Sequence, residues 1–150
     1  MAKKIAFVLV MIATLCVTSS LLGVWARHKI EKRLKIETAG KFIPTFMATS
    51  FYLKDAHFDW DDKVQFLSGD LKVDFDLLSI FKEKMRVRFS ANNIAVKLIG
   101  DWAKTQGVGD IFLDHFDADM ELGPKGKLSE IYSVNADSRK FQFHIKKSEN

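Results

Sequence analysis

The chain has 150 residues and a net charge of +4, and 47% of its residues are hydrophobic. Residues 1–39 carry a net charge of +5 and residues 40–150 a net charge of −1, so the basic excess lies outside the part that can form a domain. A nucleic-acid-binding domain normally carries positive charge on its folded surface, so we predict no nucleic-acid partner. The single cysteine, Cys16, excludes a disulfide within the chain.

The first element is an uncharged segment of 21 residues, 5–25. A helix of this length spans about 30 Å, the thickness of the hydrocarbon layer of a bilayer. Trp25 stands at its end, where interfacial aromatic residues are common. We therefore predict a transmembrane helix over residues 5–25, after a short tail at residues 1–4. A cleaved secretory signal is the alternative, although the apolar run is longer than a typical signal core.

Two signals for the orientation of this helix conflict. More Lys and Arg residues follow the segment than precede it, which by itself places the large domain in the cytoplasm. Lys3 and Lys4 before a signal-like helix favour the opposite orientation. We predict a single-pass protein of the inner (cytoplasmic) membrane, with its C-terminal domain in the periplasm or outside the cell.

Residues 26–40 have a helix-forming, basic composition and are predicted to form a juxtamembrane helix or stalk. Basic side chains next to a membrane attract anionic lipid headgroups. The residues predicted to contact headgroups are Arg27, Lys29, Lys32, Arg33 and Lys35. A solvated stalk is the alternative interpretation.

Residues 41–150 are predicted to form one β-domain, because apolar and polar residues alternate along them. The alternation is clear at 71–77, 84–89, 94–98, 116–122 and 141–146, and weaker at 49–54, 56–60, 63–68 and 128–134. Seven to nine strands with short connections predict an antiparallel meander, since parallel pairing needs long crossovers. Short helices are expected within 77–83 and 101–107, and a turn at 123–126.

Three clusters of charged residues are candidate sites. A hairpin of 71–77 with 84–89 would place one row of acidic side chains opposite a row of basic ones: Asp70, Asp74 and Asp76 against Lys84, Arg86 and Arg88. Two further clusters have metal-binding residue types: His57, Asp59, Asp61 and Asp62, and Asp114, His115, Asp117 and Asp119. Neither spacing predicts three or four converging ligands. With no phosphate-binding loop or nucleophile motif, we predict no metal, no cofactor and no enzymatic activity.

The apolar face of the predicted sheet is the more informative feature. Twelve of the 13 phenylalanines lie outside the membrane segment, and a sheet that is apolar on one face must cover that face. Packing favours a closed sandwich or barrel. The alternative is a curved, partly open sheet whose concave face holds an acyl chain. For that groove the predicted lipid contacts are Phe75, Val87, Phe89, Val96, Leu98, Phe116, Met120, Phe141 and Phe143.

The sequence SGDLKVDFDLL at 68–78, with MRVRF at 85–89 and NIAVKL at 93–98, resembles the repeat of bacterial envelope proteins of the AsmA and TamB kind. The layout of tail, helix and β-domain is also similar to LptC, a membrane-anchored component of lipopolysaccharide transport. The resemblance covers residues 45–145. It implies an apolar groove that binds or passes lipid between envelope membranes without a cofactor.

Two hypotheses for function follow. The first is an anchored envelope protein that handles membrane lipid or forms part of a lipid-transport or envelope-biogenesis assembly. The second is a structural docking subunit, a closed β-sandwich without a ligand that binds other envelope proteins through an edge strand.

Overall fold

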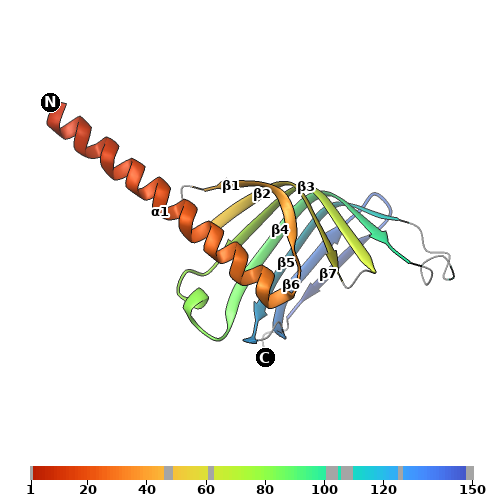
Figure 1. The fold of residues 1–150 in the computed structure, drawn as a ribbon. Coiled ribbons are helices and arrows are strands. Elements are labelled where there is room, and N and C mark those ends of the chain that lie inside the picture. Colours follow the sequence, from red (N-terminus) through yellow and green to blue (C-terminus); the bar gives the residue numbers. More distant parts are fainter. Residues whose placement is uncertain are drawn as a thin grey trace.

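The computed structural model describes residues 2–45, 49–60, 63–100, 105, 110–124 and 127–147. One long helix is followed by a sheet of seven strands (Figure 1). The elements are α1 (Ala2–Leu34), β1 (Thr38–Pro44), β2 (Ser50–Trp60), β3 (Val64–Phe75), the 3-10 turn η1 (Ser79–Phe81), β4 (Met85–Leu98), β5 (Ile111–Leu122), β6 (Leu128–Asp137) and β7 (Gln142–Lys146).

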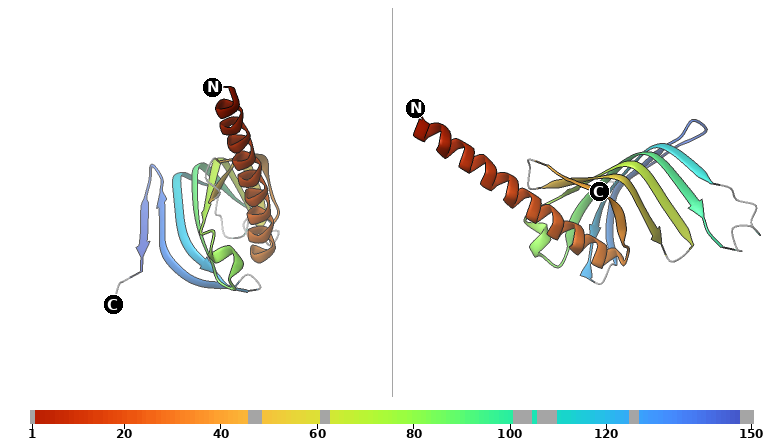
Figure 2. Two further views of the ribbon diagram at one scale, coloured as in Figure 1. Left: turned by 90° about the vertical axis from the view of Figure 1, so that its left-hand side faces the viewer. Right: turned by 45° about the horizontal axis from the view of Figure 1, so that its top comes forward.

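The seven strands form one sheet in which each strand pairs antiparallel with the next, in the order β1 to β7. The predicted antiparallel meander is therefore confirmed. The sheet is curved (Figure 2), but it stays open, with β1 and β7 at its two edges. The expected closure into a sandwich or barrel is wrong, because another element covers part of the concave face.

That element is the second half of α1. Ser19, Gly23, Ala26 and Ile30 are buried, and their spacing of three and four residues places them along one side of the helix. At Gly23 a Cβ atom would lie 2.9 Å from the ring of Phe42, so the helix lies close to the sheet. The segment predicted as a juxtamembrane stalk thus packs on the domain, and the sheet begins at Thr38, before the predicted boundary at residue 41.

The core lies between α1 and the concave face of the sheet. Its largest fully buried side chains come from three strands: Phe51 and Leu53 of β2, Met85, Val87 and Ile94 of β4, and Leu122 of β5. Apolar burial of this kind is the main favourable contribution to folding. The helix α1 and the sheet therefore share one core.

A row of irregular positions crosses the sheet and shifts the alternation of side chains by one residue. Asp55 and Asn93 each have a φ of 52°, and Gly40 of the first strand has a φ of 141°. In register, Gly69 lies between Asp55 and Asn93. Glycine, aspartate and asparagine adopt such left-handed conformations more readily than other residues. On the strands that carry these positions, the side chains of the concave face are therefore three residues apart instead of two at this point, as from Leu53 to Ala56.

This shift explains where the predicted strands differ from the observed ones. Segments 63–68 and 71–77 fall in one strand, β3, and segments 84–89 and 94–98 fall in β4. The expected helical turn within 77–83 is confirmed by η1. Of the predicted helix at 101–107, only residue 105 is described. In the expected turn at 123–126, the Gly123 N–H donates to the Lys127 carbonyl (2.8 Å), and residues 125 and 126 lie outside the described part.

Candidate functional site

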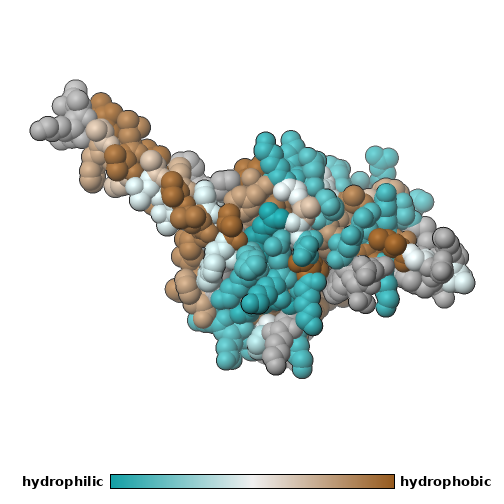
Figure 3. Space-filling view, in the orientation of Figure 1, coloured by the Kyte–Doolittle hydropathy of each residue, from teal (hydrophilic) through white to brown (hydrophobic). Residues whose placement is uncertain are grey.

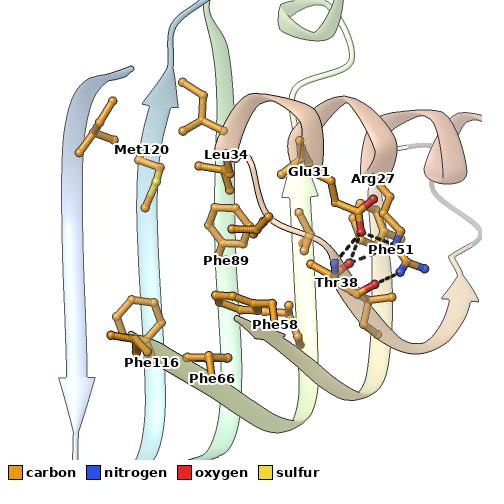
Figure 4. A pocket seen from close by; sticks show the side chains of 18 residues that line it. Arg27, Glu31, Leu34, Thr38, Phe51, Phe58, Phe66, Phe89, Phe116 and Met120 are labelled. Atoms are coloured by element: carbon orange, nitrogen blue, oxygen red, sulfur yellow. Dashed lines mark hydrogen bonds and ion pairs between the residues drawn. The ribbon is translucent and has the colours of Figure 1, made fainter. Parts of the chain in front are cut away.

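A cavity of about 350 Å³ lies between the C-terminal part of α1 and the concave face of the sheet. Fifteen of its 18 lining residues are apolar. Ile30 and Leu34 line it from the helix, and the opposite wall is formed by apolar side chains of β2 to β6, among them Phe58, Phe66, Phe89, Phe116 and Met120 (Figure 4). A concave, mainly apolar site of this size is typical of small-molecule binding.

The three polar lining residues gather at one end of the cavity and bind one another. The Nε atom of Arg27 donates to Glu31 Oε1 (3.0 Å) and to Thr38 Oγ1 (3.1 Å). The Thr38 backbone N–H donates to Glu31 Oε1 (3.1 Å), and the Thr38 hydroxyl donates to the same oxygen (Figure 4). Because these groups are mutually paired, the cavity favours an apolar occupant over a charged one.

The nine predicted groove residues occupy three environments. Phe89, Phe116 and Met120 line the cavity. Phe75 and Val87 are buried in the core, while Val96 packs against it and Leu98 is half-buried at the end of β4. Phe143, in the edge strand β7, and Phe141, just before that strand, are exposed.

The concave face beyond the cavity is not covered by α1. Register places Phe143 beside Ala136, and Ala136 beside Phe116, so β7 continues the same apolar face. Leu128 of β6 still lines the cavity, and beyond it this face carries half-exposed apolar side chains of β6 and β7, namely Ile131, Phe143 and Ile145. The apolar surface therefore extends from the cavity to the open edge of the sheet.

The five basic residues predicted to contact headgroups do not share one environment. Arg27 is paired inside the cavity. Arg33 donates to the backbone carbonyls of Lys82 (3.0 Å), Glu83 (2.8 Å) and Leu122 (2.8 Å), and so links α1 to the β3–β4 connection and to the end of β5. Lys29 lies over the ring of Trp25, 4.8 Å from its centroid, and Lys32 and Lys35 are exposed. Contact of these residues with headgroups stays a prediction.

The convex face carries the charged rows. The predicted hairpin forms, with Asp74 opposite Arg88 in register. The ion pairs of Arg86 and Arg88, however, are made with Asp119 of β5 (2.8 and 2.9 Å). Hydrogen bonds from Arg86, followed by those from Arg88, hold the pKa of Asp119 below its ordinary value despite its burial.

Neither metal-ligand cluster is assembled in the described residues, among which no group of three His, Cys, Asp or Glu side chains converges. Asp59 accepts a hydrogen bond from Gln65 (3.1 Å), while Asp61 and Asp62 lie outside the described residues. His115 lies between Asn92 and Asp117, at 2.7 Å from each. Asp119 is bound by the two arginines.

Sequence reasoning missed the helix, β2 and β3 as walls of the site. Phe58 and Phe66 fall in the weakly alternating segments, and their rings stack 4.6 Å apart. Ile30 and Leu34 belong to a stretch whose basic residues dominate its composition. The spacing of Ala26, Ile30 and Leu34 is the signal that would have found the buried side of the helix.

Comparisons with protein-family models, with curated proteins and with solved structures found no match. The helix α1 is long and apolar enough to cross a membrane. A helix that can act as a membrane anchor, joined to an open antiparallel sheet with an apolar cavity beneath it, is therefore the basis for any assignment of function.

Proposed function

We propose that this chain is a single-pass envelope protein whose β-domain binds an acyl chain of a membrane lipid in the cavity under α1. In this proposal α1 spans the inner membrane and the β-domain lies on its periplasmic or outer side. The domain acts as a segment of a lipid-transport or envelope-biogenesis assembly.

The main support for this proposal is the apolar lining of the cavity. Its lining is apolar apart from three mutually paired residues, and a site without free charges favours hydrocarbon. The apolar face continues past the cavity over β6 and β7. A long, flexible ligand with part of its length outside the cavity fits this arrangement better than a compact one.

The position of the cavity along α1 also supports a membrane ligand. The lining helical residues run from Arg27 to Leu34, beginning two residues after the uncharged segment ends at Trp25. At 1.5 Å per residue, the lining starts about 3 Å beyond that end. A lipid leaving the adjacent leaflet would have a short path to the cavity.

Site-specific photo-crosslinking in cells tests the proposal. Benzoylphenylalanine at Phe116 stands in the cavity wall. The matched control is Phe112, on the same strand, which is 66% exposed and which alternation places on the convex face. We expect lipid adducts, identified by mass spectrometry, at position 116 and not at 112. Equal yields at the two positions, or no lipid at 116, would contradict lipid binding in the cavity.

A second candidate function, docking onto another envelope protein, is favoured by the edge strand β7. All five of its residues are exposed, and Phe143 and Ile145 present apolar side chains. Exposed edge strands pair with other chains. A charge at this edge, Ile145→Lys, should abolish co-purification of a partner while leaving lipid adducts at position 116. Loss of the adducts instead would argue that edge and cavity form one lipid path.

A further inference from the structure

The connection between β3 and β4 exposes two large apolar side chains beside the anchor helix. Leu78 is 71% exposed and Phe81 is 70% exposed. The ring of Phe81 lies 5.4 Å from the ring of Trp25, centroid to centroid. In Figure 3 the hydrophobic surface of α1 continues along the margin of the domain where this loop lies, whereas the centre of the same face is hydrophilic.

Hydrogen bonds give this loop a defined shape. The Asp76 carboxylate accepts from the Leu78 N–H (3.1 Å), and the Asp76 carbonyl accepts from the Ser79 N–H (3.0 Å) and hydroxyl (2.8 Å). The Ser79 hydroxyl in turn accepts from the Arg86 N–H (3.2 Å). The exposure of the two apolar side chains is therefore built into an ordered turn.

The loop is also fixed relative to the helix. Arg33 donates to the carbonyls of Lys82 and Glu83 at the end of the turn. Phe81 contacts Trp25, about two turns earlier on α1. The loop thus runs along the helix, with Phe81 toward the N-terminal, uncharged part and the carbonyls bound by Arg33 away from it.

The length of α1 determines where the bilayer surface must lie. The helix begins to be buried by the domain at Ser19, so residues 5–18 are the uncharged part before the first buried residue. Fourteen helical residues span about 21 Å, less than the roughly 30 Å of the hydrocarbon layer. The bilayer must therefore include the helix as far as about Trp25. Trp25 then lies at the boundary between hydrocarbon and headgroups, and Phe81, whose ring contacts Trp25, lies at the same level.

We propose that the β3–β4 loop inserts Leu78 and Phe81 into the membrane interface beside α1, and so seats the β-domain directly on the bilayer. Aromatic and aliphatic side chains at this level bury their surface about 5–10 Å into the boundary between headgroups and acyl chains. Lys82 in the same loop and Lys29 on the helix lie close to anionic headgroups in this arrangement. This contact between the loop and the membrane does not depend on what occupies the cavity.

Spin labels on the full-length chain in phospholipid vesicles test whether the loop inserts into the membrane interface. The background variant is Cys16→Ser, because Cys16 is the only cysteine. Single cysteines replace Leu78, Phe81 or, as the control, Arg139 in the exposed β6–β7 turn at the opposite end of the strands. We expect the labels at 78 and 81 to collide readily with oxygen and rarely with a water-soluble nickel chelate, and the label at 139 to show the reverse.

Two outcomes would contradict insertion of the loop into the membrane interface. Chelate access at 78 and 81 equal to that at 139 means that the loop lies in water. Low access to both oxygen and the chelate means that protein, such as a second copy of the chain, covers the loop. Leu78 is 71% exposed and is not part of the Trp25–Phe81 ring pair, so a label at position 78 tests the proposal even if Phe81→Cys disturbs that pair.

Discussion

The concave face of the sheet is divided into two regions with the same kind of side chain and opposite environments. In the buried region, Ile94 of β4 is 1% exposed and belongs to the same core as Ala26 and Ile30 of α1, whereas Ile145 of β7, on the same face, is 49% exposed. The alternation of apolar and polar residues is similar in the two strands. The pattern therefore predicts which face of a strand is apolar, but the element that covers the face decides whether it becomes core or open surface.

The covered region owes its burial to a helix that also has the length and composition of a membrane anchor. The uncovered region leads from the cavity to the edge of the sheet. In our account the fully buried side chains of the first region stabilise the fold, while the cavity and the uncovered region that continues from it are available to a ligand or partner. Changes in the two regions should accordingly separate stability from binding.

The largest expected effect comes from placing a charge where α1 meets the sheet. Ile30→Asp puts a carboxylate at a side chain that is 4% exposed, and an uncompensated buried charge costs about 3–5 kcal/mol. His28→Asp, two residues earlier and exposed, is the control. The free energy of unfolding, from denaturant titration of the full-length chain in detergent, should fall only for Ile30→Asp. Equal losses would mean that the helix does not stabilise the sheet.

Truncating one isoleucine in each region tests the comparison directly. Ile94→Ala removes buried methyl groups and should lower the free energy of unfolding by about 2–4 kcal/mol. Ile145→Ala should change it by less than about 0.5 kcal/mol, because its side chain is half-exposed. The same titration measures both variants. A large loss from Ile145→Ala would show that β7 belongs to the stabilising core.

A smaller effect is expected at the C-terminal end of α1. Arg33→Met removes hydrogen bonds to two carbonyls of the β3–β4 connection and one at the end of β5. We expect a loss of about 1–2 kcal/mol, since two of these bonds are exposed to solvent. Lys32→Met changes the neighbouring exposed residue and is the control. Hydrogen exchange at residues 82 and 83 should also speed up in Arg33→Met alone; unchanged exchange would mean that Arg33 does not hold the loop.

The smallest effect concerns the convex face, where pH changes the pairing of Asp119. The pKa of this carboxylate is lowered, above all by hydrogen bonds from Arg86. Its contribution to stability is therefore full above the ordinary aspartate pKa and is lost as the pH falls through the lowered value. Asp119→Asn should cost about 1 kcal/mol at neutral pH and progressively less in acid. A difference between wild type and Asp119→Asn that does not shrink in acid would contradict this role.

Much of the fold could be predicted from the sequence, because period-two alternation is direct evidence of half-buried strands. The strand lengths could not, since the residues at Asp55, Gly69 and Asn93 shift the alternation and divide each strand into two apparent segments. The cavity was found in part: Phe89, Phe116 and Met120 were predicted. Its helical wall was not, because basic residues dominate the stretch that contains Ile30 and Leu34 and conceal the apolar side of the helix.

The measurement that tests the central claim most directly is native mass spectrometry of the full-length chain, extracted from its own membrane in mild detergent. Phe89 lines the cavity and is only partly buried, so Phe89→Asp should leave the protein folded but put a charge in the apolar lining. The matched variant Phe112→Asp carries the same change on the convex face. We predict bound lipid on the wild type and Phe112→Asp, and its loss from a folded Phe89→Asp. A wild-type chain without lipid, or equal lipid on all three proteins, would contradict the account.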